Sequence, residues 1–187
     1  MEVEVSAEAK DKRLNRMVAI TVVILSVFTG VCNIKDGNLV QAMQQAQSDS
    51  VDSWNEYQAT KTKLHIAQTA REQIAVFVNG ERAAQAQAVE HKLDGEIAKY
   101  QGEIPKLLRQ AKGYSDQYDA LNVHDDQFDA SEALISTAIS LAAVAALCES
   151  AWLLSASWIF GAFGMFLGVC GFARWAFHPD ILSNFLG

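Results

Sequence analysis

The chain has 187 residues, half of them apolar and 20% charged, and its formal net charge is −7. The acidic balance excludes general nucleic-acid binding, because phosphate contacts need a basic face and none follows the N-terminus. Cysteine occurs only at Cys32, Cys148 and Cys170, which provide neither a disulfide framework nor zinc-ligand spacing.

The first predicted element is a membrane span at residues 17–34, preceded by a cytoplasmic tail at 1–16. Its 18 uncharged residues reach about 27 Å as a helix, which nearly crosses a bilayer core. A cleaved export signal is the alternative, but acidic residues dilute the basic cluster and no small-residue cleavage site follows. Four basic residues before the span place the N-terminus in the cytoplasm. They are Lys10, Lys12, Arg13 and Arg16.

Residues 35–130 are predicted to form a helical hairpin outside the cytoplasm. The turn-forming stretch at 35–38 predicts that the first span ends or bends there, and Asn79-Gly80 predicts the reversal between two long helices. The second helix carries a coiled-coil-like seam at four-three spacing. Its members are Leu93, Ile97, Tyr100, Ile104, Leu107, Ala111, Tyr114, Tyr118 and Leu121. Pro105 predicts a kink or break near residues 102–105.

Two helices alone bury little surface, so the hairpin is expected to need a partner. Trp54 and Tyr57 lie on the less regular first helix and are candidate contacts to another copy or another protein. Packing of both aromatic residues within the chain is an equally weighted alternative.

The stretch SDQYDALNVHDDQFDASE gathers acidic residues immediately before the second apolar run. His124, Asp125, Asp126 and Asp129 are weak candidates for a metal site, but their spacing matches no ligand loop. A solvated acidic helix face, with Asp129 or Ser131 capping the second span, is the favoured interpretation. No metal site is therefore predicted.

Two further membrane spans are predicted at 131–149 and 151–173, with a cytoplasmic turn at Glu149-Ser150 and a C-terminal tail at 174–187. The last span carries small residues at four-three spacing that allow another helix to approach closely. They are Ser157, Gly161, Gly164, Gly168 and Gly171. Helix association is expected there, either within the chain or between subunits.

The predicted fold is thus all-α, with three transmembrane helices and the long hairpin between the first two. Nucleotide-binding, hydrolase and zinc-protease motifs are absent from the sequence, and no enzymatic activity or cofactor is expected. The favoured role is assembly or scaffolding, with membrane lipids and either a second copy or a larger membrane complex as partners. An oligomeric pore or transport component is the alternative, for which Thr21, Ser26, Thr29 and Asn33 offer only a sparse polar lining.

The segment SWNEYQATKTK has the pattern W-x-x-Y-Q-A-x-x-x-K and precedes HDDQFDASEALISTAISLAAVAAL, a His- and Phe-containing approach to a double span. In this order the chain resembles a bacterial membrane-protein family known as domain of unknown function 4337. The resemblance implies topology and no activity. In a Gram-negative cell, the orientation predicted from the basic residues places the spans in the inner membrane and the hairpin in the periplasm. Family members often carry an Arg-rich turn between the last two spans, where this chain has CESAW.

Overall fold

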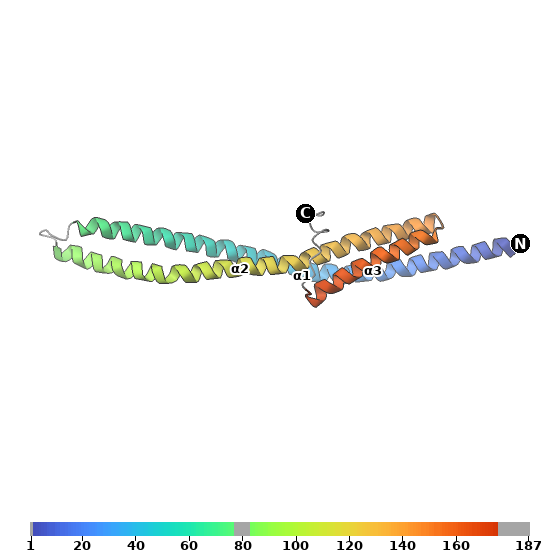
Figure 1. Ribbon diagram of the computed structural model, residues 1–187, viewed down its shortest axis with the longest axis horizontal. Helices are drawn as coiled ribbons and strands as arrows, with labels where there is room; N and C mark the ends of the chain where they lie inside the picture. Colours follow the sequence, from blue (N-terminus) through green and yellow to red (C-terminus); the bar gives the residue numbers. More distant parts are fainter. Residues whose placement is uncertain (1, 77–82, 176–187) are drawn as a thin grey trace. The chain divides into compact units, whose positions relative to one another are not determined.

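A computed structural model describes residues 2–76 and 83–175, with side chains from residue 12 onward. Three helices make up nearly all of this part of the chain: α1 (Glu2–Ala75), α2 (Ala83–Leu147) and α3 (Ala151–Ala173) (Figure 1). The described residues contain no strand, so the predicted all-α fold is confirmed. The predicted reversal at Asn79-Gly80 and the tail after Trp175 lie outside the described residues.

The helix does not end at residues 35–38, where the sequence predicts that the first span ends or bends, because α1 continues through this stretch to Ala75. Gly37 has a negative φ and open space around its Cβ position. A glycine inside a helix costs only about 1 kcal/mol relative to alanine. Cys32 and Leu39, buried on either side of the turn-forming stretch, outweigh that local preference.

The break predicted at Pro105 is also not found, since α2 runs unbroken from Ala83 to Leu147. Proline removes one helical hydrogen bond, which leaves the carbonyl of Gln101 without its N–H donor. Gln101 and Pro105 both lie on the exposed side of α2, where water can bond to that carbonyl. The helix tolerates the proline for this reason.

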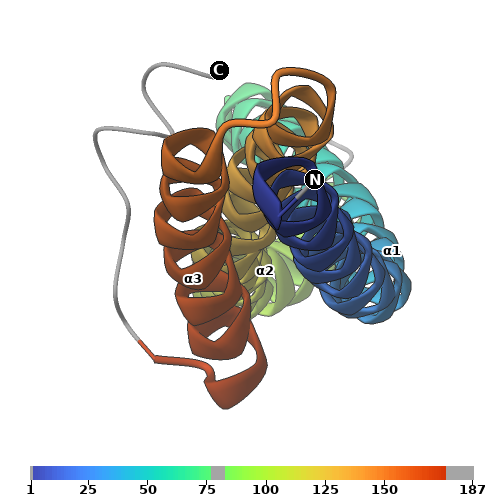
Figure 2. The same cartoon turned by 90° about the vertical axis from the view of Figure 1, so that its right-hand side faces the viewer.

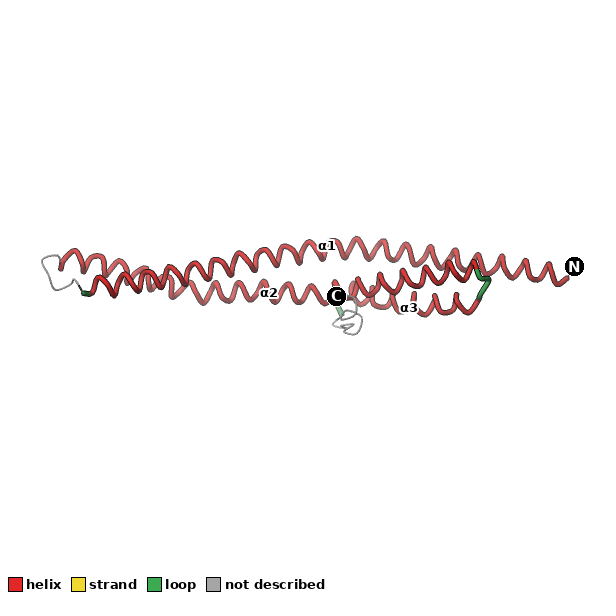
Figure 3. The backbone as a smooth tube through the Cα atoms, turned by 90° about the horizontal axis from the view of Figure 1, so that it is seen from above, coloured by secondary structure: helices red, strands yellow, loops and turns green. Residues whose placement is uncertain are grey.

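A tight turn at Cys148–Ser150 separates α2 from α3 and appears as the short loop between them in Figure 3. Glu149 adopts a left-handed conformation with φ 50, and the Ser150 N–H donates to the Ala145 carbonyl at 3.0 Å. These contacts close the end of α2. The turn lies where the sequence predicts it.

The chain divides into two units, of which unit 1 comprises Met1–Ala42 with Ala120–Gly187. Figure 2, which looks along the helices, shows the parts of α1, α2 and α3 in this unit side by side. Their core includes clusters of buried apolar residues to which both α1 and α2 contribute. One contains Leu14, Val18, Ala142, Ala145 and Leu154, and another contains Leu25, Ile135 and Ala138.

Unit 2 comprises Met43–Asp119, in which one segment of α1 and one of α2 lie side by side (Figures 1 and 3). The less exposed positions of α1 here recur at four-three spacing, which is the repeat of a coiled-coil seam. They are Met43, Ala46, Ser50, Ser53, Tyr57, Thr60, Leu64, Ala67, Arg71 and Ile74. Alanine, serine and threonine occupy half of this seam, which explains why hydrophobicity alone predicts it poorly.

Each of the three helices contains a stretch long and apolar enough to cross a membrane by length and composition. Many large apolar side chains of these stretches are exposed in unit 1. On α1 they include Ile20, Val23, Ile24, Val27, Val31 and Ile34, and on α3 they include Trp152, Ile159, Phe163 and Val169.

Candidate functional site

The small-residue face of α3 is buried inside unit 1. All five of its predicted members, Ser157, Gly161, Gly164, Gly168 and Gly171, are buried in the single chain. A Cβ atom at Gly164 would lie 2.7 Å from Ile135 Cγ1, and one at Gly168 would lie 2.7 Å from Phe28 Cε1. The face therefore packs against α1 and α2 of the same chain, which favours the first of the two predicted kinds of association.

Two serine hydroxyls join α2 to α3 at this face. Ser131 Oγ donates to the Gly164 carbonyl at 2.8 Å, and Ser157 Oγ donates to the Ala138 carbonyl at 2.7 Å. Both serines are fully buried. The predicted capping role of Asp129 or Ser131 is wrong, because α2 has no N-terminus there and Ser131 bonds to another helix instead. Ser131 also hydrogen-bonds to the Cys32 side chain of α1.

Residues of α2 just before the second apolar run contact the C-terminal end of α3. Gln127 is fully buried, and its Nε2 donates to the Trp175 carbonyl at 2.9 Å, while its Oε1 lies 3.1 Å from His124 Nδ1. The Phe128 ring meets Phe172 edge to face at 5.3 Å between centroids. These contacts satisfy a carbonyl beyond the end of α3 and hold that end against α2.

A pair of carboxyl groups joins α1 to α2 at the same level of unit 1. Asp36 of α1 and Asp125 of α2 are half-buried, and their carboxyl groups lie within hydrogen-bonding reach of each other. Burial, together with repulsion from Asp129 and Asp36, raises the pKa of Asp125 to about 6. Burial and repulsion from Asp129 also raise the pKa of Asp36.

The four weak metal candidates of the sequence do not form a ligand group. His124 is bonded to Gln127, Asp125 to Asp36, and Asp129 is exposed. Among the described residues, no group of three or more His, Cys, Asp or Glu side chains is placed to hold a metal ion. Although the residue as a whole is exposed, partial burial of its carboxyl group and the negative charge of Asp126 raise the pKa of Asp129.

Asp36 is the residue of this site that the sequence reasoning missed. In the sequence, Asp36 lies in the turn-forming stretch at residues 35–38. In the structure this stretch is part of the continuous helix α1, and the helix determines which residues lie next to Asp36. The missed signal is its spacing: Asp36 lies four residues after Cys32 and three before Leu39, both of which are buried. A charged residue at such a position predicts a polar partner on the facing helix.

The nine predicted seam residues of α2, of which eight lie in unit 2, are all half-buried or buried. Ala111 is completely buried, and the others, from Leu93 to Leu121, are half-buried. Trp54 and Tyr57 are also half-buried and meet edge to face at 5.5 Å, with the Lys61 ammonium 5.4 Å from the Tyr57 ring centroid. Tyr57 thus lies on the α1 seam, and Trp54 lies beside it.

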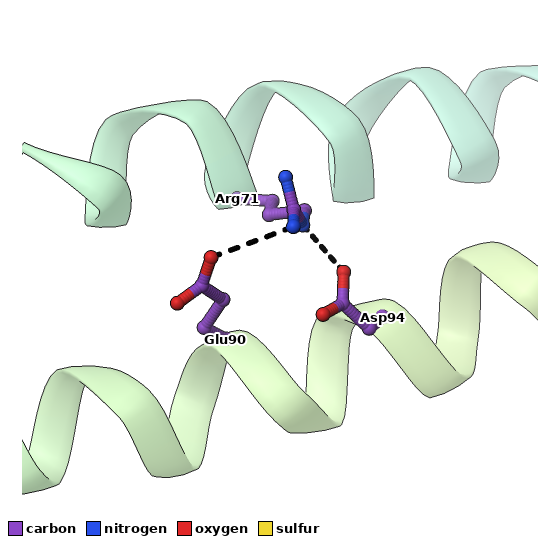
Figure 4. A network of polar contacts seen from close by, with 3 residues as sticks. All are labelled: Arg71, Glu90 and Asp94. Carbon is purple, nitrogen blue, oxygen red and sulfur yellow. Dashed lines mark hydrogen bonds and ion pairs between the residues drawn. The ribbon is translucent and has the colours of Figure 1, made fainter.

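Arg71 is a charged member of the α1 seam and contacts two carboxylates of α2 (Figure 4). Its guanidinium lies 3.5 Å from Glu90 Oε1, and its Nε donates to Asp94 Oδ1. Exposed ion pairs of this kind contribute little to stability, typically below about 1 kcal/mol. Their placement one turn apart on α2 instead specifies which residues of the two helices face each other.

No curated protein and no solved structure matches the chain. A family match covers residues 14–174, which include the small-residue face of α3, the carboxyl pair and all of unit 2. The family is described as a domain of unknown function, so the match supplies no activity. Because it spans most of the sequence, the chain belongs to the domain of unknown function family DUF4337.

Proposed function

We propose that the chain is a non-catalytic integral membrane protein of the bacterial inner membrane that acts in assembly or scaffolding. Three spans anchor it, with a cytoplasmic N-terminus and the α1–α2 hairpin in the periplasm. Its partners are lipids and either a second copy or a larger membrane complex. The observation that carries this proposal is a row of small and polar residues on α1, Ser26, Gly30 and Asn33, which are exposed within an otherwise apolar segment.

Exposure of the apolar side chains supports the membrane part of the proposal. Val23, Val27 and Ile34 are 62%, 63% and 72% exposed, which would be unfavourable over so large a surface in water. Trp152 and Trp175, at the two ends of α3, are 71% and 56% exposed. Tryptophan is enriched at both interfaces of membrane-spanning segments, where its ring meets apolar chains and polar headgroups.

The outer side of α1 supports the assembly part. Ser26, Gly30 and Asn33 recur at four-three spacing and are all exposed, and a Cβ at Gly30 would meet nothing within 4 Å. Small residues allow close helix approach, and a polar side chain facing lipid gains from a hydrogen-bonding partner on another helix. This face differs from the small-residue face of α3, because none of the three described helices covers it.

The pore alternative has less support in the residues that suggested it. Thr29 Oγ1 donates to the Leu25 carbonyl at 3.0 Å within α1, and Thr21 Oγ1 accepts from Trp158 Nε1 at 2.9 Å. These two hydroxyls are engaged within the chain. The other two polar residues that suggested a pore are Ser26 and Asn33, and two side chains are few for the lining of a polar pathway.

The topology can be tested with a single cysteine at Ser115, an exposed residue of α2, in a chain whose three native cysteines are replaced. We expect Ser115→Cys to react with a membrane-impermeant thiol reagent in intact spheroplasts, because unit 2 is proposed to lie outside the cytoplasm. Labelling measured by a mass shift provides the readout. Reaction only after lysis would reverse the proposed orientation.

The assembly face can be tested by Gly30→Leu, read out by native mass measurement in mild detergent. A leucine there keeps the helix apolar but separates a second helix from the α1 backbone. We expect self-association to weaken about tenfold, since the lost packing is on the order of 1 kcal/mol. Ile159→Leu, on the exposed side of α3, is the matched control and should leave the mass unchanged. An unchanged oligomer in Gly30→Leu would remove this face from the proposal.

A further inference from the structure

The carboxyl pair Asp36–Asp125 lies in a setting that does not suit two ionised groups. Cys32 and Leu39 precede and follow Asp36 on its helix face, and Phe128 follows Asp125, and all three are buried. The Oδ1 atoms of Asp36 and Asp125 are shielded from solvent and receive no N–H or O–H donor from the described residues. A buried oxygen without a donor is costly, so the pair needs a source of protons.

Each carboxyl can supply the donor for the other only if it is protonated. An ionised carboxylate has acceptor oxygens alone, whereas a protonated carboxyl also has an O–H donor. One proton on the pair therefore creates a strong charge-assisted hydrogen bond between α1 and α2. No further group is required, because the two carboxyl groups lie within hydrogen-bonding reach of each other across the interface.

The charges that act on the pair oppose its ionisation. Asp126 and Asp129 of α2 disfavour the charged form of Asp125, and Asp129 and Glu132 disfavour that of Asp36. His124 of α2 is engaged with Gln127. Among the basic residues, Lys35 directly precedes Asp36 on α1, and Arg174 follows the end of α3.

We propose that Asp36 and Asp125 share one proton and form a pH-sensitive latch between α1 and α2, closed in acidic solution and loosened near neutral pH. This inference goes beyond the proposed assembly function and does not depend on it. The latch acts on the packing of unit 1 at the level where Gln127 and Phe128 hold the end of α3. Loss of the proton places two negative charges in contact, together with those of Asp129 and Glu132.

The direction of the pH effect follows from the raised pKa of Asp125. Its value is about 6 in the closed structure against 3.8 for an unperturbed aspartate. Between these values the closed form binds more protons than the open one, so the stability of the closed form falls as pH rises and then levels off. Both side chains are partly exposed, so solvent screening reduces the effect, and we expect the opening equilibrium to rise about tenfold.

The test uses the full-length protein in lipid nanodiscs and two readouts. Infrared titration should show a protonated-carboxyl band that persists to about pH 6 in the unaltered protein. Asp125→Asn and Asp36→Asn should remove it. Hydrogen exchange around Asp36 and Asp125, corrected for intrinsic rates, should lose about tenfold protection between about pH 4 and about pH 7 in the unaltered protein. In the Asn variants, protection should not change with pH, because an amide donates without a proton from solution.

Asp116→Asn is the matched control, since Asp116 is an exposed aspartate on the same helix. It should retain both the band and the pH-dependent protection. The proposal is overturned if the band disappears near pH 4, about the ordinary aspartate value, or survives in Asp125→Asn. It is equally overturned if exchange in a folded Asn variant keeps the pH dependence of the unaltered protein. If neither Asn variant folds, the infrared titration of the unaltered protein and of Asp116→Asn decides by itself.

Discussion

Gly164→Leu is expected to destabilise unit 1 strongly. A Cβ atom added at this position would lie 2.7 Å from Ile135 Cγ1 and 3.1 Å from both Leu134 Cβ and the Ser131 carbonyl oxygen. Leu134 Cβ and the Ser131 carbonyl oxygen can move only if the α2 backbone moves with them. Overpacking of this kind costs about 3 kcal/mol, so the midpoint of thermal unfolding in detergent should fall by about 6–12 °C.

Gly113→Leu provides the control, because the same substitution at this exposed position of α2 meets open space. It should leave the midpoint within about 2 °C, as surface substitutions usually do. Gly168→Leu should behave like Gly164→Leu, since its Cβ would lie 2.7 Å from Phe28 Cε1 and 2.9 Å from Ser131 Oγ. If Gly164→Leu keeps its midpoint and only the oligomer mass changes, the small-residue face of α3 joins subunits and the intrachain packing is incorrect.

Phe128→Ala is expected to have the second largest effect. Phe128 is 2% exposed and its ring packs against Phe172. A Cβ atom at Gly171 would lie 2.9 Å from Phe128 Cζ, so the ring also packs closely against the α3 backbone. Removing it leaves a cavity under the end of α3, beside the Gln127 bond to the Trp175 carbonyl. The loss should be about 3 kcal/mol, again measured as a lower unfolding midpoint in detergent.

Hydrogen exchange separates this effect from a general loss of stability. The amides near the C-terminal end of α3 should lose protection first, because Phe128 and Gln127 hold that end. Phe160→Ala is the matched control, since Phe160 lies on α3 and is 40% exposed. A midpoint drop as large in Phe160→Ala as in Phe128→Ala would contradict the assignment of Phe128 to the packed face.

Features that depend on nearby residues were readable from the sequence. Uncharged runs of sufficient length predict apolar helices, and the turn at Glu149-Ser150 follows from the two charged or polar residues between two such runs. The four-three spacing from Leu93 to Leu121 predicts one side of α2, and those positions are the less exposed ones. Helical periodicity is a property of one segment, so one sequence suffices to detect it.

Tertiary structure alone decided the features that join distant segments. Gly37 and Pro105 read locally as the end of a helix, but burial of flanking residues and access of water to one carbonyl allow α1 and α2 to continue. Ser131 reads as a cap, yet it bonds to the Gly164 carbonyl 33 residues away. Asp36 and Asp125 look like ordinary surface carboxylates until the continuous α1 brings one against the other. Local preferences of about 1 kcal/mol are smaller than the burial and desolvation terms that operate across helices, so these outcomes depend on the partner helix.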